Sequence, residues 1–102
     1  MRLEYYSADK LASEILEIIG KHLDISEYKV FFFGSRTIDK GNEHSDVDVG
    51  IQGPERIPWK VMNAIKEELE ELPTLYKIDI MDFYNAPEKF RRVIKEEREY
   101  IN

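Results

Sequence analysis

Apolar side chains recur in two parts of the chain at the spacing of one helical face. The first set follows Ser7, a residue type that often caps a helix, and predicts an amphipathic helix over residues 8–23. Its members are Leu11, Ile15, Ile18, Ile19 and Leu23. The second set predicts a helix that begins near Pro58 and stops before Pro73. Its members are Val61, Ile65, Leu69 and Leu72.

Three other segments have the patterns of β-strands. Residues 29–33 form an almost unbroken apolar run, which is typical of a central strand covered on both faces. Residues 46–51 alternate with a period of two, so that aspartates share one face and branched apolar residues the other. Residues 76–83 alternate in the same way. There, Lys77, Asp79 and Met81 share a face opposite Ile78 and Ile80.

The last part of the chain is predicted to be helical. Asn85, with Glu88 three residues later, has the form of a capping box. The apolar positions that follow are Phe90, Val93, Ile94 and Ile101. The charged run 95–99 would then lie on a solvated helix face. The order helix, strand, strand, helix, strand, helix predicts one α/β (α+β) domain over residues 1–102, with helices packed on a small mixed β-sheet.

Composition limits what such a domain can bind. A chain of 102 residues holds only one small core. Its 15 basic and 21 acidic residues give a net charge of −6, which opposes stable direct binding to nucleic acid but not to a triphosphate held by metal. There is no cysteine for a disulfide or a thiolate metal site. With no signal peptide and no membrane-spanning run, a soluble cytoplasmic protein without a membrane partner is expected.

The aspartates in the strands point to metal chemistry. Asp46 and Asp48 lie two apart on one strand face, where two like charges repel unless a cation lies between them. Mg²⁺ suits this position because it prefers a few carboxylates together with water and phosphate oxygens. If Asp79 lies on a neighbouring strand and faces the same way, three carboxylates can bind two metal ions roughly 4 Å apart. That arrangement suits in-line displacement at phosphorus.

A glycine and a serine precede these carboxylates at the end of an apolar strand. Gly34 lets the backbone approach a phosphate, and the hydroxyl and N–H groups around Ser35 can donate to its oxygens. The combined pattern is Gly-Ser, ten residues, Asp-x-Asp, and a third aspartate on a later strand. Metal and phosphate would therefore be held at one place.

Each of these residues also has a plainer interpretation. Asp46 and Asp48 could line a solvated edge strand, and Asp79 could pair with a lysine or an arginine. Ser35 could be a turn residue. Lys77, on the face of Asp79, could steer phosphate or neutralise the carboxylates, and the sequence does not decide between the two.

Three other ionisable residues are expected to have no catalytic role. Asp82 lies on the strand face opposite Asp79, which favours a strand-end or turn carboxylate over a metal ligand. His44 precedes the Asp-x-Asp motif in a loop and is expected at the surface. His22 lies near the end of the first helix, where the helix dipole favours a cation.

The chain resembles the nucleotidyltransferase superfamily with a DNA polymerase β-type catalytic core. Within it, the chain is similar to the minimal nucleotidyltransferases, which are small stand-alone proteins of about this length. The resemblance extends from the first helix through FFFGSR, SDVDVGI and YKIDIMDF to FRRVIKEEREYI. It implies a polymerase β-like fold for nearly the whole chain.

The resemblance also implies roles for the motif residues. Asp46 and Asp48 would bind Mg²⁺, and Asp79 would complete the site for two ions and help to deprotonate the attacking hydroxyl. The turn that holds the β and γ phosphates of ATP would contain Gly34, Ser35 and Arg36. Relatives commonly continue this turn with a second basic residue and a glycine, where this chain has Ile38 and Asp39.

Minimal nucleotidyltransferases are typically antitoxins whose partner is a small helical HEPN-domain ribonuclease, and family members transfer AMP from ATP to a tyrosine of that toxin. The resemblance thus implies a protein adenylyltransferase. A small core without a second domain agrees with an acceptor that docks from outside. Two alternatives remain: an antitoxin that neutralises its partner by binding alone, favoured by Ile38 and Asp39, and transfer to a small molecule. A homo-oligomer or a hetero-oligomer with the toxin is left open.

Overall fold

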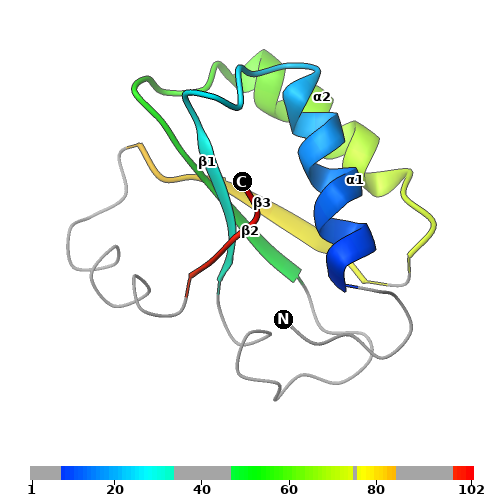
Figure 1. The fold of residues 1–102 in the computed structure, drawn as a ribbon. Coiled ribbons are helices and arrows are strands. Elements are labelled where there is room, and N and C mark those ends of the chain that lie inside the picture. The colour runs from blue at the N-terminus through cyan, green and yellow to red at the C-terminus, as the bar shows by residue number, and fades with distance from the viewer. Residues whose placement is uncertain (1–7, 34–46, 75, 85–97) are drawn as a thin grey trace.

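A computed structural model describes residues 8–33, 47–74, 76–84 and 98–102. Two helices and four strands follow one another in these ranges. They are α1 (Ala8–Gly20), β1 (Lys29–Phe33), β2 (Val47–Gln52), α2 (Trp59–Glu70), β3 (Ile78–Asp82) and β4 (Glu99–Tyr100). Figure 1 shows α1 and α2 together on one face of the sheet. The expected small mixed sheet with packed helices is confirmed.

The strands form one sheet in the order β3-β2-β1-β4. β1 pairs antiparallel with both of its neighbours, whereas β2 and β3 are parallel. A parallel pair needs a crossover because the chain must return to the same end of the sheet. α2 supplies this crossover, and the sheet is therefore mixed.

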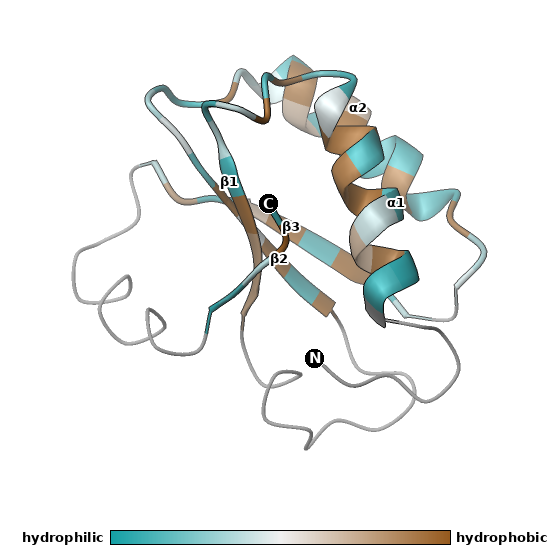
Figure 2. Ribbon diagram, viewed as in Figure 1, coloured by the Kyte–Doolittle hydropathy of each residue, from teal (hydrophilic) through white to brown (hydrophobic). Residues whose placement is uncertain are grey.

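The main core lies between the sheet and the two helices. Apolar stripes of α1 and α2 meet the inward side chains of the strands, as the brown bands in Figure 2 show. Fully buried members are Leu11, Ile15 and Ile19 of α1, Val30 and Phe32 of β1, Val47, Val49 and Ile51 of β2, and Ile65 of α2. The helical spacing read from the sequence is thus the spacing of the buried face.

β1 is buried on both faces, as its unbroken apolar run predicts. Val30 and Phe32 belong to the core under the helices. Phe31 and Phe33 point to the opposite face, where they pack with Phe83 in a second cluster. The rings of Phe31 and Phe83 meet edge to face, with centroids 5.0 Å apart and an interplanar angle of 75°.

The helix expected to reach Ile101 is wrong for the described end of the chain. Residues 99–100 form β4, and the N–H of Ile101 donates to the carbonyl of Val30 at 2.9 Å. A strand is favoured here because β1 would otherwise leave backbone groups on its second edge unpaired. The N-terminal part of the expected helix, with Phe90, Val93 and Ile94, lies outside the described residues.

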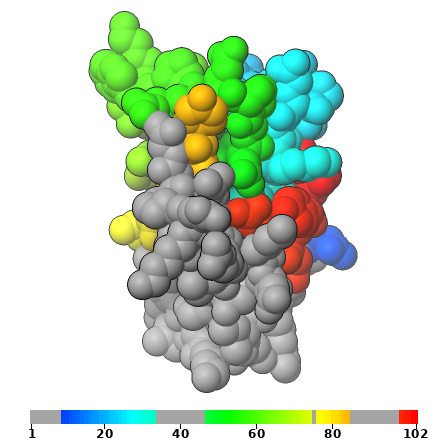
Figure 3. Space-filling view, turned by 90° about the vertical axis from the view of Figure 1, so that its left-hand side faces the viewer, coloured from blue at the N-terminus to red at the C-terminus, as the bar shows by residue number. Residues whose placement is uncertain are grey.

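Arg98 also departs from the expected solvated helix face. Its guanidinium lies over the ring of Phe31, 4.4 Å from the centroid, and over that of Phe83 at 5.2 Å. It donates to Oε1 of Gln52 at 2.8 Å. In Figure 3 the red residues 98–102 accordingly lie against the cyan and green segments that contain β1 and β2.

The side chain of Asn102 hydrogen-bonds to the backbone at the start of β1. Its Oδ1 accepts a hydrogen bond from the N–H of Val30 at 2.7 Å. Its Nδ2 donates to the carbonyls of Ile25 at 3.0 Å and Tyr28 at 2.7 Å. One side chain thus satisfies three backbone groups of the segment that leads into the central strand.

The helix ends differ slightly from the prediction. α1 ends at Gly20, and the expected last turn is a separate turn in which the N–H of Leu23 donates to the carbonyl of Ile19 at 2.9 Å. Leu23 still packs against the core, which explains its place in the apolar pattern. α2 begins just after Pro58, as predicted. Ser7 lies outside the described residues.

Candidate active site

Asp48 and Asp79 are the second residues of β2 and β3, and the parallel register places them directly opposite each other. Neighbouring strands lie about 4.8 Å apart, and residues paired in this way project to the same side of the sheet. The condition set by the sequence, that Asp79 lie on a neighbouring strand and face the same way, is therefore met.

The two carboxylates lie on the sheet face away from the helices. Val47, Val49 and Ile80 are buried in the core under α1 and α2. Since side chains alternate along a strand, Asp48 and Asp79 project to the other face, where both are half-buried. Among the described residues, both helices lie on the opposite face of the sheet, so neither α1 nor α2 covers the two carboxylates.

The same face becomes aromatic further along β2. A Cβ atom at Gly50 would lie 2.4 Å from the ring of Phe31 and 2.8 Å from that of Phe83, so no side chain fits there. The aromatic rings occupy this space instead. The face therefore has a polar end at Asp48 and a dry end at the rings, which confines charge chemistry to the polar end.

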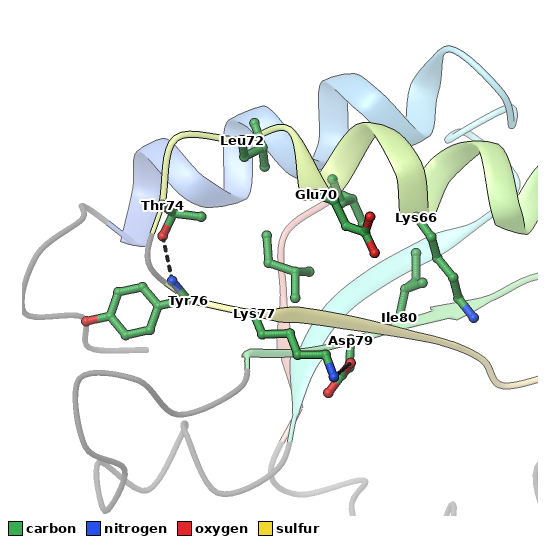
Figure 4. A pocket seen from close by; sticks show the side chains of 10 residues that line it. Lys66, Glu70, Leu72, Thr74, Tyr76, Lys77, Asp79 and Ile80 are labelled. Atoms are coloured by element: carbon green, nitrogen blue, oxygen red, sulfur yellow. Dashed lines mark hydrogen bonds and ion pairs between the residues drawn. The ribbon is translucent and has the colours of Figure 1, made fainter.

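Asp79 pairs with Lys77, as one of the plainer interpretations allows. Lys77 Nζ lies 3.9 Å from Oδ1 of Asp79, and their side chains are 73% and 45% exposed. Figure 4 shows the two side chains together beside β3. An exposed pair of this length contributes about 0–1 kcal/mol, too little to prevent the carboxylate from binding a metal ion. Lys77 therefore lowers the local negative charge, and a metal ion can still displace it from Asp79.

Asp82 is a structural carboxylate, and the prediction is confirmed. Its Oδ2 accepts from the N–H of Ile57 at 2.8 Å, and its Oδ1 accepts from the N–H of Tyr84 at 2.9 Å. Both oxygens bind backbone groups at the end of β3. This aspartate fixes the loop that leads into α2 rather than a metal ion.

The remaining motif residues lie outside the described residues, and their roles stay predictions. They are Gly34, Ser35 and Arg36 of the turn, and Asp46. The described chain nevertheless fixes where these segments are attached. Phe33, the residue before Gly34, is paired in register with Asp48. Val47, the residue after Asp46, is paired with Ile78. The residues on either side of segment 34–46 therefore lie beside Asp48 and Asp79.

The donor atoms of the site fit a hard cation such as Mg²⁺. Asp48 and Asp79 offer carboxylate oxygens from adjacent strands, which Mg²⁺ prefers over nitrogen and sulfur ligands. Within the described ranges, no group of three His, Cys, Asp or Glu residues is close enough to bind a metal ion. The third carboxylate of the expected set, Asp46, would have to complete the site.

His22 contacts an acidic side chain between the two helices. It hydrogen-bonds through Nε2 to Oε2 of Glu68 on α2, and Nζ of Lys21 lies 3.3 Å from Oε1 of the same residue. The hydrogen bond from His22, followed by that from Lys21, lowers the pKa of Glu68 below its usual value. These contacts join the end of α1 to α2.

A pocket of about 280 Å³ borders the candidate site on the outer side of β3. Figure 4 shows Lys66 and Glu70 reaching into it from α2, opposite Asp79 of β3 and Lys77, the residue just before this strand. The sequence analysis did not single out Lys66. The sequence feature that could have indicated Lys66 is its position directly after the buried Ile65, at the border of the apolar stripe of α2.

None of the helices in the described part of the chain has the length and apolar character needed to cross a membrane.

Comparison with known proteins agrees with the fold. The model of a family described as "Polymerase beta, Nucleotidyltransferase" matches residues 13–102. The probable protein adenylyltransferase MntA of Haemophilus influenzae is 30% identical over 87 residues, which cover 83% of this chain and 76% of that protein.

Solved structures show the same architecture at low sequence identity. The structure of the tri-AMPylated Shewanella oneidensis HEPN toxin in complex with the MNT antitoxin contains a chain with a TM-score of 0.63 and 11% identity. The match covers 91% of this chain and 70% of that one. A toxin–antitoxin structure with AMP-PNP gives a TM-score of 0.65 at 12% identity and covers 94% and 73% of the two chains. The expected polymerase β-like fold is confirmed.

Proposed function

Because this chain belongs to the polymerase beta nucleotidyltransferase family, we propose that it is a Mg²⁺-dependent adenylyltransferase that transfers AMP from ATP to a tyrosine of a HEPN-type toxin. It thereby acts as the antitoxin of that toxin. The observation that carries this proposal is the pairing of Asp48 with Asp79 on one sheet face. Two carboxylates opposite each other repel, and a cation bound between them removes this repulsion.

The relatives support the finer parts of the proposal. The relative from Haemophilus influenzae is named a probable protein adenylyltransferase. Among the structures of similar fold, one contains a tri-AMPylated HEPN toxin and one contains AMP-PNP. Together they favour ATP as the nucleotide and a protein as the acceptor. The sequence departure at Ile38 and Asp39 makes binding without catalysis the second candidate.

The proposed reaction is an in-line displacement at the α-phosphorus of ATP. The tyrosine oxygen forms a bond to this phosphorus while the bond to the pyrophosphate oxygen breaks. Asp79 takes the proton of the tyrosine hydroxyl, and Gly34, Ser35 and Arg36 hold the departing β and γ phosphates. Asp46, Asp48 and Asp79 would hold Mg²⁺, which when bound would supply charge stabilisation to the phosphoryl oxygens.

The proposal is tested by incubating the protein with labelled ATP, Mg²⁺ and a purified HEPN-type toxin, and by mass spectrometry of the toxin. AMP on a toxin tyrosine is the expected result. Absence of the adduct, with toxin inhibition that persists in an Asp46→Ala/Asp48→Ala variant, would exclude catalysis and leave binding as the function. Inhibition that is lost in this variant without any adduct would indicate that metal or nucleotide is needed for binding.

A further inference from the structure

The outer edge of β3 presents backbone groups without a partner among the described residues. β3 is the last strand of the sheet on that side. At its two ends, the carbonyl of Lys77 accepts from β2 at 2.7 Å and the N–H of Phe83 donates to β2 at 2.8 Å. The N–H and C=O groups of successive residues point to opposite edges of a strand. Since Lys77 and Phe83 bond to β2, the N–H and C=O groups of Ile78 and Ile80 point outward. A row of unpaired groups of this kind can pair with another strand.

Two adjoining pockets follow this edge between β3 and α2, and together they are called the edge groove below. The first contains Lys77 and Asp79 of the candidate site. The second has a volume of about 480 Å³ and contains Trp59, a residue that is 70% exposed. Lys66 and Ile80 line both pockets, which makes the edge groove continuous. It leads from an exposed aromatic residue to the candidate catalytic carboxylate.

The lining of the edge groove contains the acidic residues Glu70, Asp79 and Asp82 and the basic residues Arg56, Lys66 and Lys77. Lys66 is the lysine that lines both pockets. Its side chain is exposed, and no ion pair joins it to another described residue. In Figure 4 it extends from α2 towards β3. A lysine in this position favours an acidic side chain on whatever occupies the edge groove. The exposed Trp59 offers the type of anchor that is common in protein interfaces.

We propose that the edge groove binds an extended segment of the acceptor protein, which pairs with β3 as an additional strand and carries an acidic side chain opposite Lys66. This inference rests on the proposed function and deepens it, because it assigns the mode by which the acceptor is held. Main-chain hydrogen bonds to Ile78 and Ile80 supply affinity, and an acidic side chain opposite Lys66 supplies selectivity. A residue placed opposite Asp79 on the added strand projects from the same sheet face, at about 5 Å between Cβ atoms.

Amide hydrogen exchange tests the pairing directly. The full chain is compared with its complex with a purified HEPN-type toxin, and exchange at Ile78 and Ile80 is expected to slow at least about tenfold in the complex. Unchanged exchange at both amides in a formed complex would overturn the proposal. Slow exchange that appears in the chain alone as its concentration rises would also overturn it, because a second copy would then occupy the edge.

Substitutions with matched controls test the charge and the backbone donor. Lys66→Glu is expected to raise the KM for the toxin about fivefold or more at unchanged kcat, whereas Lys60→Glu, the same change on an exposed residue of the same helix, leaves KM within about twofold. Ile78→Pro removes the outward N–H at the first residue of the strand and is expected to weaken toxin binding, whereas Ile78→Val retains it. Equal KM values for the two lysine variants would overturn the proposal.

These outcomes separate the docking mode from the reaction. AMP transfer that is unaffected by Lys66→Glu and Ile78→Pro would leave the proposed function intact and overturn the edge groove. Protected amides at Ile78 and Ile80, with toxin binding weakened by Lys66→Glu but no AMP transfer by the wild-type protein, would support the edge groove and overturn the catalytic function.

Discussion

Asp48 and Asp79 are direct register partners in the parallel pair of β2 and β3, so their carboxylates leave the sheet on the same face. Asp48→Asn or Asp79→Asn should reduce AMP transfer to the toxin about 100-fold or more, because each removes a negative ligand of the metal site. Initial rates with labelled ATP measure this. Glu67→Gln, which removes one exposed carboxylate from α2, is the matched control and should keep the wild-type rate.

The same variants separate metal binding from turnover. Mg²⁺ should raise the melting temperature of the wild-type protein, because an ion that binds only the folded state stabilises it. Asp48→Asn and Asp79→Asn should lose most of this shift while melting near the wild-type temperature in EDTA. A full Mg²⁺-dependent shift in both variants would contradict a site made from these carboxylates.

Gly50 is required by the aromatic rings that fill its face of the sheet. Gly50→Ala should lower the free energy of unfolding by about 1–3 kcal/mol, because the added methyl group would meet Phe31 at 2.4 Å. Urea denaturation measures the loss. Gly20→Ala is the control, since its methyl group would meet only Ile25 at 3.8 Å, an ordinary contact. A loss at position 20 as large as that at position 50 would contradict this explanation.

Asp82 differs from Asp48 and Asp79 in purpose, and its substitution should show the difference. Asp82→Ala leaves the N–H groups of Ile57 and Tyr84 without their carboxylate acceptor and should cost about 1–3 kcal/mol of unfolding free energy. AMP transfer at a temperature where the variant stays folded should remain near wild type. Loss of transfer without loss of stability would instead place Asp82 in the reaction.

The contact of Glu68 with His22 and Lys21 should make stability depend on acid. The folded protein has a pKa for Glu68 below the ordinary value of 4.5, so the unfolded chain binds the proton more readily. This contribution is complete above pH 4.5 and is lost as the pH falls through the lower, folded value. Melting temperatures at several pH values should therefore fall less steeply below pH 4.5 for Glu68→Gln. Equal slopes for both proteins would contradict this linkage.

Local patterns predicted most of the fold because they are enforced by burial. The helical spacing of Leu11 and Ile15 and the alternation around Asp48 follow directly from which side chains must leave water. The short strand at Glu99 and Tyr100 has no such pattern, and only the unpaired edge of β1 makes it a strand. Sequence alone cannot show that edge, because it arises from the strand order.

The candidate site was predictable to the same extent. Alternation fixed the faces of Asp48 and Asp79 within their own strands, but their direct opposition depends on the parallel register and on the crossover through α2. The edge groove was not predictable, because Lys66 acquires its position only when α2 packs beside β3. Arg98 was assigned to solvent for the same reason, since its aromatic partners belong to distant strands.

The hydrogen bond from Val30 to Asn102 joins residues 72 positions apart, and this separation affects the order in which the sheet forms during synthesis. During synthesis, residues 29–33 are made early and must wait for residues 99–102 before their outer edge is paired. Until then an apolar strand presents an open edge that can pair with other nascent chains. The outer edge of β1 is closed only after residues 99–102 have been made and have folded against it.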